Sequence, residues 1–351
     1  MSVGSGLPES QPCRTPNRTL STRLPQPSLR NFQSPVVIFG NATGDHLLAL
    51  PAFRALASLF PHRFSVVCMP GFRRTFFADL PLRSVLEVKM RGRRRPRTFN
   101  AAAVARRIGK CDLFLSLNPW RSISLDRLVR LLSPRLSIGF SPAFHVALCK
   151  RLTQHAAGEA FRVPARLDPR LRLHDFASPF RLPPQIRPRI RQFLQATAPG
   201  QRILAVHNET KPRKIWPPQR LSRLLAAFLR RHPDFVVFVL DFHKPKLHLP
   251  NFKGRVIHSR GLPLLYAFGV VQESDLFLGA DSSMLHAADL FRVPGVGLFG
   301  PTDPRRYGFR FARHRHIRNR RGMKYIQESA VLAALESILS QLLASRGREI
   351  A

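Results

Sequence analysis

The sequence predicts an α/β protein made of two doubly wound parallel sheets, and three observations support this fold class. The chain has 351 residues, of which 44% are hydrophobic, so it can form two domains with their own cores. Short runs of β-branched and aromatic residues alternate with helical patterns along most of the chain, which is typical of parallel sheets covered by helices. A proline-rich stretch at residues 176–200 separates two such sets, and we expect a cleft between the resulting domains.

We expect five segments along the chain. The first segment is rich in Ser, Thr, Pro and Arg and has no apolar signal core. We interpret it as a disordered basic tail or a misassigned start, and an organellar transit peptide is the alternative. The expected segments are 1–34 for this tail, 35–180 for the first domain, 181–200 for the linker, 201–325 for the second domain and 326–351 for a C-terminal helix.

The first domain is predicted to begin with a strand, because residues 35–40 (PVVIFG) are a short apolar run rich in valine. A helical pattern follows from Gly44-Asp45 to Phe60, and Pro51 within it is expected to kink the helix or mark a restart. The same kind of apolar run predicts further strands at 63–70 (RFSVVCMP), 111–118 (CDLFLSLN) and 136–140 (LSIGF).

The second domain shows the same alternation of strands and helices. Its predicted strands are 202–208 (RILAVHN), 235–241 (FVVFVLD), 255–259 (RVIHS), 275–281 (DLFLGAD) and 293–300 (VPGVGLFG). A helix is predicted over 217–231, where Pro217-Pro218 suit a helix start. Further helices are predicted over 283–290 and 329–345, and the second of these has an amphipathic pattern.

The charge balance is strongly basic. There are 57 Lys and Arg against 20 Asp and Glu, a formal net charge of +37, which attracts polyanions such as nucleic acids, anionic lipids and acidic glycans. Residues 83–97 and 305–324 carry the densest basic runs, and a solvated basic surface is their default interpretation. No helix-turn-helix, RNA-recognition or zinc-finger signature accompanies them, which argues against nucleic acid, and an anionic membrane surface is the other partner that this charge suits.

Cysteine spacing and hydropathy exclude other classes. The four cysteines are scattered without a CxxC pair, which argues against a zinc cluster or a redox dithiol and fits a reducing compartment. The longest apolar runs are far shorter than the roughly 18 residues that a membrane-spanning helix requires.

The first segment that carries chemistry is FGNATGDHLLALP, residues 39–51. It leaves a strand at Gly40 and enters a helix at Gly44-Asp45, at the edge of the sheet where α/β proteins bind ligands. Its glycine spacing is neither GxGxxG nor GxxxxGK[ST], which argues against a nicotinamide oxidoreductase and a P-loop enzyme. Asp45 is either a first-turn charge or cap of the helix, or a general base in the cleft.

The second segment is HNETKPRKIWPPQR, residues 207–220, between a strand and a helix. Thr210 and Lys214, together with Lys211 and Arg213, offer hydroxyl and cationic donors that suit a diphosphate. The alternative is a solvated basic loop with Trp216 as its packing anchor.

The third segment is Asp281-Ser282-Ser283, which ends a strand and opens the helix that contains His286. Serine hydroxyls and backbone N–H groups at a helix start bind anions. The alternatives are that Asp281 caps the helix and that His286 is an ordinary surface histidine. Gly300-Pro301-Thr302-Asp303 is expected to turn over the same site.

Taken together, these three segments resemble glycosyltransferase family 9, the bacterial heptosyltransferases that build the lipopolysaccharide core. The similar residues are GDHLLALPAFRAL at 44–56, KIWP at 214–217, DSSMLH at 281–286 and LFGPTDP at 298–304, in the family's order and spacing. The resemblance covers residues 35 to 345. It departs from the family at Ser283, where glycine is usual, and in the turn HNET at 207–210.

The resemblance implies a GT-B fold, with two Rossmann-like domains that bind the acceptor in the N-terminal one and a nucleotide-sugar in the C-terminal one. It implies inverting transfer without a metal or a cofactor, and no DxD motif is present. Asp45 takes the position of the catalytic base. Thr210 and Lys214 fall where the donor diphosphate is contacted, Ser282, Ser283 and His286 fall in the phosphate-binding turn with Asp281, and Asp241 lies near an acid that holds the ribose.

The predicted function is therefore transfer of a sugar, heptose being one candidate, from a nucleoside-diphosphate donor to a hydroxyl of an anionic glycan or glycolipid such as lipopolysaccharide core. The expected location is the cytoplasm, including the inner face of the cytoplasmic membrane. The alternative is a polyanion-binding protein of the same fold that has lost catalysis, which the charge and the Ser283 departure suggest.

Overall fold

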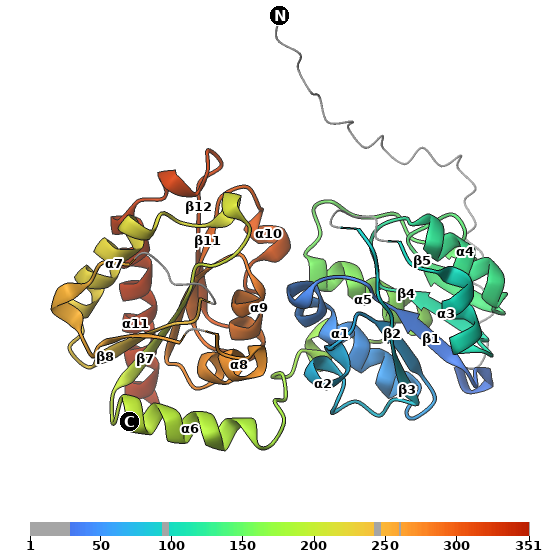
Figure 1. Cartoon of the computed structure of the whole chain (residues 1–351), viewed down its shortest axis with the longest axis horizontal. Helices are drawn as coiled ribbons and strands as arrows, with labels where there is room; N and C mark the ends of the chain where they lie inside the picture. Colours follow the sequence, from blue (N-terminus) through green and yellow to red (C-terminus); the bar gives the residue numbers. More distant parts are fainter. Residues whose placement is uncertain (1–28, 93–97, 242–246, 260, 351) are drawn as a thin grey trace, which may run out of the picture.

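The computed structural model describes residues 29–92, 98–241, 247–259 and 261–350, with the side chains of the last five of these left aside. They form two six-stranded sheets, and every pairing of neighbouring strands within them is parallel. The sheets lie in separate halves of an elongated molecule (Figure 1). The predicted α/β class with two doubly wound domains is confirmed.

The N-terminal sheet has the strand order β3-β2-β1-β4-β5-β6. Its strands are β1 (Pro35–Ile38), β2 (Ser65–Cys68), β3 (Ser84–Glu87), β4 (Leu113–Ser116), β5 (Leu136–Gly139) and β6 (Val146–Ala147). Its helices are α1 (Thr43–Leu59), α2 (Phe72–Phe76), α3 (Ala101–Ile108), α4 (Ile123–Leu132) and α5 (Ala156–Leu167). The four strands predicted in this half are present.

The C-terminal sheet has the order β12-β11-β10-β7-β8-β9. Its strands are β7 (Arg202–His207), β8 (Phe235–Val239), β9 (Val256–His258), β10 (Leu276–Ala280), β11 (Gly295–Phe299) and β12 (His314–Arg318). Its helices are α6 (Ile186–Thr197), α7 (Pro218–Arg231), α8 (Leu264–Gln272), α9 (Ser283–Leu290), α10 (Pro304–Tyr307) and α11 (Glu328–Ile350). All five strands and three helices predicted in this half are present.

Alternate residues of each strand enter different cores, which is why helices cover both faces of the sheets. In β1, Val36 and Ile38 pack with α3 and α4, whereas Val37 packs on the other face with α1 and α5. The α7 and α11 side of the second sheet has its own core. The α8 and α9 side belongs to the same hydrophobic cluster as α1 and α5, so one continuous core joins the two halves.

The expected restart at Pro51 is wrong, because α1 continues through this residue. Residues from His46 to Phe53 are all buried, and α1 packs against both α5 and α9. We attribute the unbroken helix to this packing, which offsets the roughly 3 kcal/mol that an interior proline costs.

Two strands lie in segments that we had interpreted only as basic surface. β3 falls within residues 83–97 and β12 within 305–324, and each is the edge strand of its sheet. An edge strand is paired on one side only, so it tolerates charged side chains that would be excluded from a central strand. Positions 93–97 of the first basic run lie outside the described residues.

The predicted segment bounds stay predictions, and the structure adds detail at two of them. Of the expected tail, residues 1–28 lie outside the described part, whereas Leu29–Asn31 form a 3₁₀ turn and Phe32 is buried. The expected linker contains α6, which packs against α8 and whose Arg187 and Arg191 pair with Glu273. Within the described residues, no helix is long and apolar enough to cross a membrane.

Gly279, in the central strand β10, is expected to tolerate no larger residue. A Cβ atom there would lie 2.8 Å from the backbone oxygen of His207 on the paired strand β7. Because a backbone atom in a central sheet has little room to move, Gly279→Ala should lower the free energy of unfolding by about 1–3 kcal/mol. Urea denaturation measures this change, and an unchanged midpoint would show that the sheet relaxes around the methyl group.

Candidate active site at the domain interface

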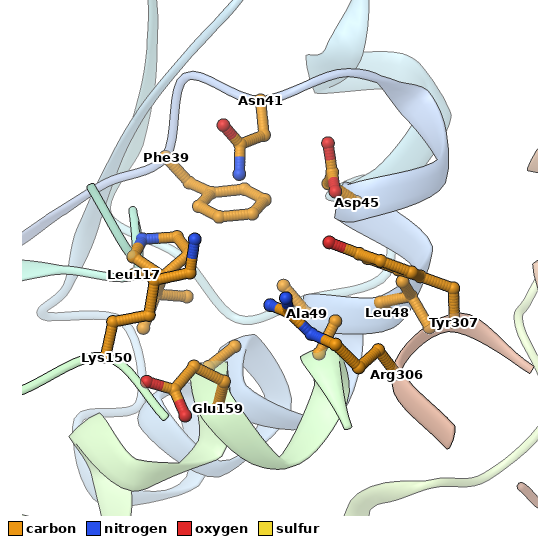
Figure 2. A pocket seen from close by; sticks show the side chains of 13 residues that line it. Phe39, Asn41, Asp45, Leu48, Ala49, Leu117, Lys150, Glu159, Arg306 and Tyr307 are labelled. Carbon is orange, nitrogen blue, oxygen red and sulfur yellow. The ribbon is translucent and has the colours of Figure 1, made fainter. Parts of the chain in front are cut away.

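Asp45 lies in the first turn of α1, at the carboxyl edge of the N-terminal sheet. The N-cap position of α1 is Ala42, so Asp45 does not cap the helix. Its carboxylate is half-buried and lines a cavity that also contains Asn41 from the β1–α1 loop and Tyr307 from the second domain (Figure 2). A carboxylate in this position can face a ligand held between the two domains.

Gly44 allows the N-terminal ends of α1 and α9 to meet. A Cβ atom at this position would lie 3.0 Å from Cδ2 of His286 and 3.5 Å from the Cα atom of Ser283. Figure 1 shows α9 and α10 on the side of the second domain that faces α1 and α5. The structure therefore places Asp45 beside the Asp-Ser-Ser turn, although the two are more than 230 residues apart in the sequence.

Lys214 joins the second and third motifs. It ends a 3₁₀ turn, Pro212–Lys214, and its Nζ donates a hydrogen bond to Oδ2 of the buried Asp281 (2.5 Å). Thr210 Oγ1 donates to the backbone oxygen of Asp281 (3.3 Å). A cation and a hydroxyl from one loop are thus held against the turn that opens α9, whereas Lys211 and Arg213 are exposed.

The start of α9 lacks a side-chain cap. Ser282 is the N-cap residue, but it makes no capping hydrogen bond, and its buried Oγ has no partner among the described residues. Asp281 is therefore not the cap, and Ser283 is the first helical residue. The uncapped N–H groups and the partial positive charge of a helix start favour an anion here.

His286 is buried rather than on the helix surface. Its Nε2 lies 3.7 Å from Oδ1 of Asp281, and its Nδ1 has no hydrogen-bond partner within the described part of the chain. Burial lowers the pKa of His286, and this effect outweighs the opposing charges of Asp281 and Asp45. The imidazole is therefore neutral at neutral pH, and its free nitrogen can bond to a ligand.

Asp241 stabilises the loop that carries Lys214. Its Oδ1 accepts hydrogen bonds from the backbone N–H groups of Asn208 (2.9 Å) and Glu209 (3.0 Å), and His207 Nδ1 lies 3.2 Å away. Asn208 in turn exchanges hydrogen bonds with the backbone of the buried Trp216. Trp216 is thus a packing anchor for this loop, and Asp241 has a structural role. The ribose contact of Asp241 stays a prediction.

The sequence analysis did not identify the residues that line the cavity opposite Asn41 and Asp45. Lys150 and Glu159 come from the first domain, and Arg306 comes with Tyr307 from α10. Figure 2 shows Glu159 and Arg306 on the side opposite Asn41 and Asp45. Arg306 lies two residues after the Gly-Pro-Thr-Asp-Pro segment, which was a signal for it, but no local pattern marks Lys150 or Glu159.

His155 connects the two domains. It is the N-cap residue of α5, where its Nδ1 accepts from Ala157 N (3.3 Å), and its Nε2 lies 3.0 Å from the backbone oxygen of Gly308. The imidazole must be neutral to accept at one nitrogen and donate at the other. Burial lowers the pKa of His155 to about 4.

We expect stability to fall with acidification because of His155. An imidazole has a pKa near 6.5 in the unfolded chain, so between about pH 6.5 and pH 4 the unfolded state binds the proton and the folded state does not. This difference amounts to about 2 kcal/mol at about pH 5. Urea unfolding of the wild type and His155→Gln at neutral pH and at about pH 5 measures it. An equal loss of unfolding free energy at about pH 5 in both proteins would show that His155 is not the cause.

Comparison with known proteins supports the fold. No protein-family model matches the sequence, and no curated protein sequence matches it. The structure has the GT-B arrangement of two Rossmann-like domains, as the motifs implied.

Among solved structures, this chain is similar to a family 9 glycosyl transferase from Veillonella parvula, with a TM-score of 0.72 and 19% identity over 88% of this chain and 97% of that one. It is also similar to the E. coli ADP-heptose lipopolysaccharide heptosyltransferase II, with a TM-score of 0.66 and 15% identity over 88% and 99% of the two chains. The E. coli heptosyltransferase WaaC with ADP has a TM-score of 0.64 and 16% identity over 87% and 99%. At these identities the similarity establishes the fold.

Proposed function

We propose that this protein is a glycosyltransferase that moves a sugar from a nucleoside-diphosphate donor to an acceptor hydroxyl. The observation that carries this proposal is the contact of Gly44 with His286 and Ser283, which brings Asp45 next to an uncapped helix start with a lysine beside it. A base and an anion site side by side are the two parts that this reaction needs. The fold and the order of the three motifs support the same proposal.

In the proposed reaction, Asp45 accepts the proton of the acceptor hydroxyl. The oxygen of that hydroxyl forms a bond to the anomeric carbon of the donor sugar at the same time. The bond from that carbon to the diphosphate oxygen breaks, and the nucleoside diphosphate leaves with the electron pair. A single displacement of this kind inverts the anomeric configuration. It needs no cofactor, because the donor supplies both the sugar and the leaving group.

Negative charge grows on the leaving diphosphate and must be stabilised. Lys214 and the N–H groups at the start of α9 are the proposed source, with Thr210, Ser282, Ser283 and His286 as further hydrogen-bonding groups. Asp281 holds Lys214 in place by its ion pair. These groups neutralise the negative charge on the leaving diphosphate, and we propose that the transfer proceeds without a metal.

The neighbours and the charge support a choice of donor and acceptor classes to test first. Two similar structures are named for ADP-heptose or hold ADP, so an adenosine-diphosphate sugar, heptose included, is the first donor to test. The net charge of +37 favours an anionic glycan or glycolipid acceptor such as lipopolysaccharide core. We propose that the enzyme acts in the cytoplasm and binds the anionic inner face of the cytoplasmic membrane.

The test is a calorimetric titration with ADP, UDP, GDP and CMP. We expect one nucleotide to bind selectively, and that nucleotide identifies the donor class. The basic excess favours a second candidate, a polyanion-binding protein of the same fold without catalysis. Equal, salt-sensitive binding of all four nucleotides would favour this second candidate and contradict a working donor site.

A further inference from the structure

The cavity next to Asp45 contains a buried carboxylate with one oxygen that lacks a partner. Glu159, in the first turn of α5, is 3% exposed and lines this cavity. Its Oε1 accepts hydrogen bonds from the backbone N–H of Arg151 (3.0 Å) and from Arg162 NH1 (2.9 Å). Its Oε2 is buried and has no hydrogen-bond partner within the described part of the chain.

An unsatisfied buried carboxylate oxygen is costly. Leaving a buried hydrogen-bonding group without a partner costs about 1–3 kcal/mol, and more for a charged group. Holding α5 in place does not explain why Oε2 is buried, because Oε1 alone accepts the hydrogen bonds from Arg151 and Arg162. A hydrogen-bond donor that enters the cavity would satisfy Oε2.

The surroundings favour a neutral donor over a cation. Arg162 already neutralises the carboxylate of Glu159 by an ion pair at 2.9 Å. Lys150 and Arg306 line the same cavity, and a second cation would be repelled by them. Arg306 also has a buried Nε with no hydrogen-bond partner among the described residues, so the cavity offers a donor as well as an acceptor. Sugar hydroxyls, which donate and accept, match this combination.

We propose that this cavity is a sugar subsite in which Glu159 Oε2 accepts a hydrogen bond from a second hydroxyl of the acceptor, distinct from the hydroxyl that Asp45 deprotonates. This inference rests on the proposed transferase function. It implies that the sugar to be extended carries at least two free hydroxyls, one on the Asp45 side of the cavity and one on the Glu159 side. Arg306, from the second domain, completes the subsite opposite Asp45.

Glu159→Gln tests the proposal because it replaces the hydrogen-bond acceptor Oε2 by a hydrogen-bond donor. The amide oxygen must face the two donors, Arg151 N–H and Arg162, so the amide NH₂ must take the position of Oε2. An acceptor is thereby replaced by a donor with almost no change in shape. The probes are methyl glycosides of hexoses and heptoses, measured by saturation-transfer NMR with ADP present at saturation.

We expect the wild type to bind at least one glycoside and Glu159→Gln to bind it about tenfold more weakly, as the loss of one hydrogen bond to a charged group predicts. ADP affinity should stay unchanged. Arg162→Gln is the matched control, because it removes the structural partner and keeps the free oxygen; it should lower the melting temperature and retain glycoside binding.

Equal glycoside binding by the wild type and Glu159→Gln would overturn the role of Glu159. A similar loss of melting temperature in both variants, with glycoside binding intact, would make Glu159 structural only. If no glycoside binds the wild type, the sugar subsite is wrong. The ADP titration of the same samples then shows separately whether the donor half of the proposed function survives.

Discussion

Asp45→Asn should reduce turnover by about 10²–10⁴-fold, the typical contribution of a positioned general base. The amide has the same shape as the carboxylate but cannot accept a proton. Asp45 is half-buried at the start of α1 and is not its cap, so the substitution should leave the fold intact. The measurement is release of nucleoside diphosphate from the donor, with lipopolysaccharide-core oligosaccharide as acceptor.

The donor site provides the control for this variant. Nucleotide affinity of Asp45→Asn should stay within about twofold of the wild type, because Lys214 and the start of α9 remain in place. Full activity in the variant would remove Asp45 from the role of base. Loss of both nucleotide binding and turnover would mean that the substitution disturbs the contact between α1 and α9.

Lys214→Ala should weaken nucleoside-diphosphate binding by about 10–100-fold, the range for losing one hydrogen bond between charged groups. A second cost follows from the ion pair, because Asp281 is buried and loses the cation that neutralises it. An uncompensated carboxylate beside the phosphate site would repel the ligand. Calorimetric titration with the nucleotide that the wild type selects measures the effect.

Lys211→Ala is the matched control, since Lys211 lies in the same loop but is exposed. It removes the same charge from the basic field without touching Asp281. Equal losses in Lys211→Ala and Lys214→Ala would show that binding reflects the net charge alone. A selective loss in Lys214→Ala would locate the diphosphate at the start of α9.

Much of the fold was predictable because strands and helices leave local patterns. The valine- and phenylalanine-rich runs that became β1 and β8 are buried on both faces, so they are continuous and apolar. β3 and β12 were not predicted, because edge strands carry charged residues and are then not continuous apolar runs. The unbroken α1 was missed because only packing against α5 and α9 compensates for Pro51.

The candidate site was predictable in part. Asp45, Lys214 and His286 lie within three motifs that follow one another along the chain, each at a strand–loop–helix junction. The structure brings these three motifs together at one interface. Asp241 lies on the neighbouring strand end and bonds to the loop of Lys214. The roles of these residues in binding and catalysis stay predictions, which the variants above test.

The two α/β halves and the loops that carry polar groups could be predicted from local patterns, because periodicity and turn chemistry are properties of neighbouring residues. The three-dimensional packing was needed to show that the N-terminal ends of α1 and α9 meet and that Glu159 and Arg306 share a cavity with Asp45. Those contacts depend on how the two halves of the molecule dock against each other. Docking is set by the shapes of whole faces, and no local pattern in the sequence encodes it.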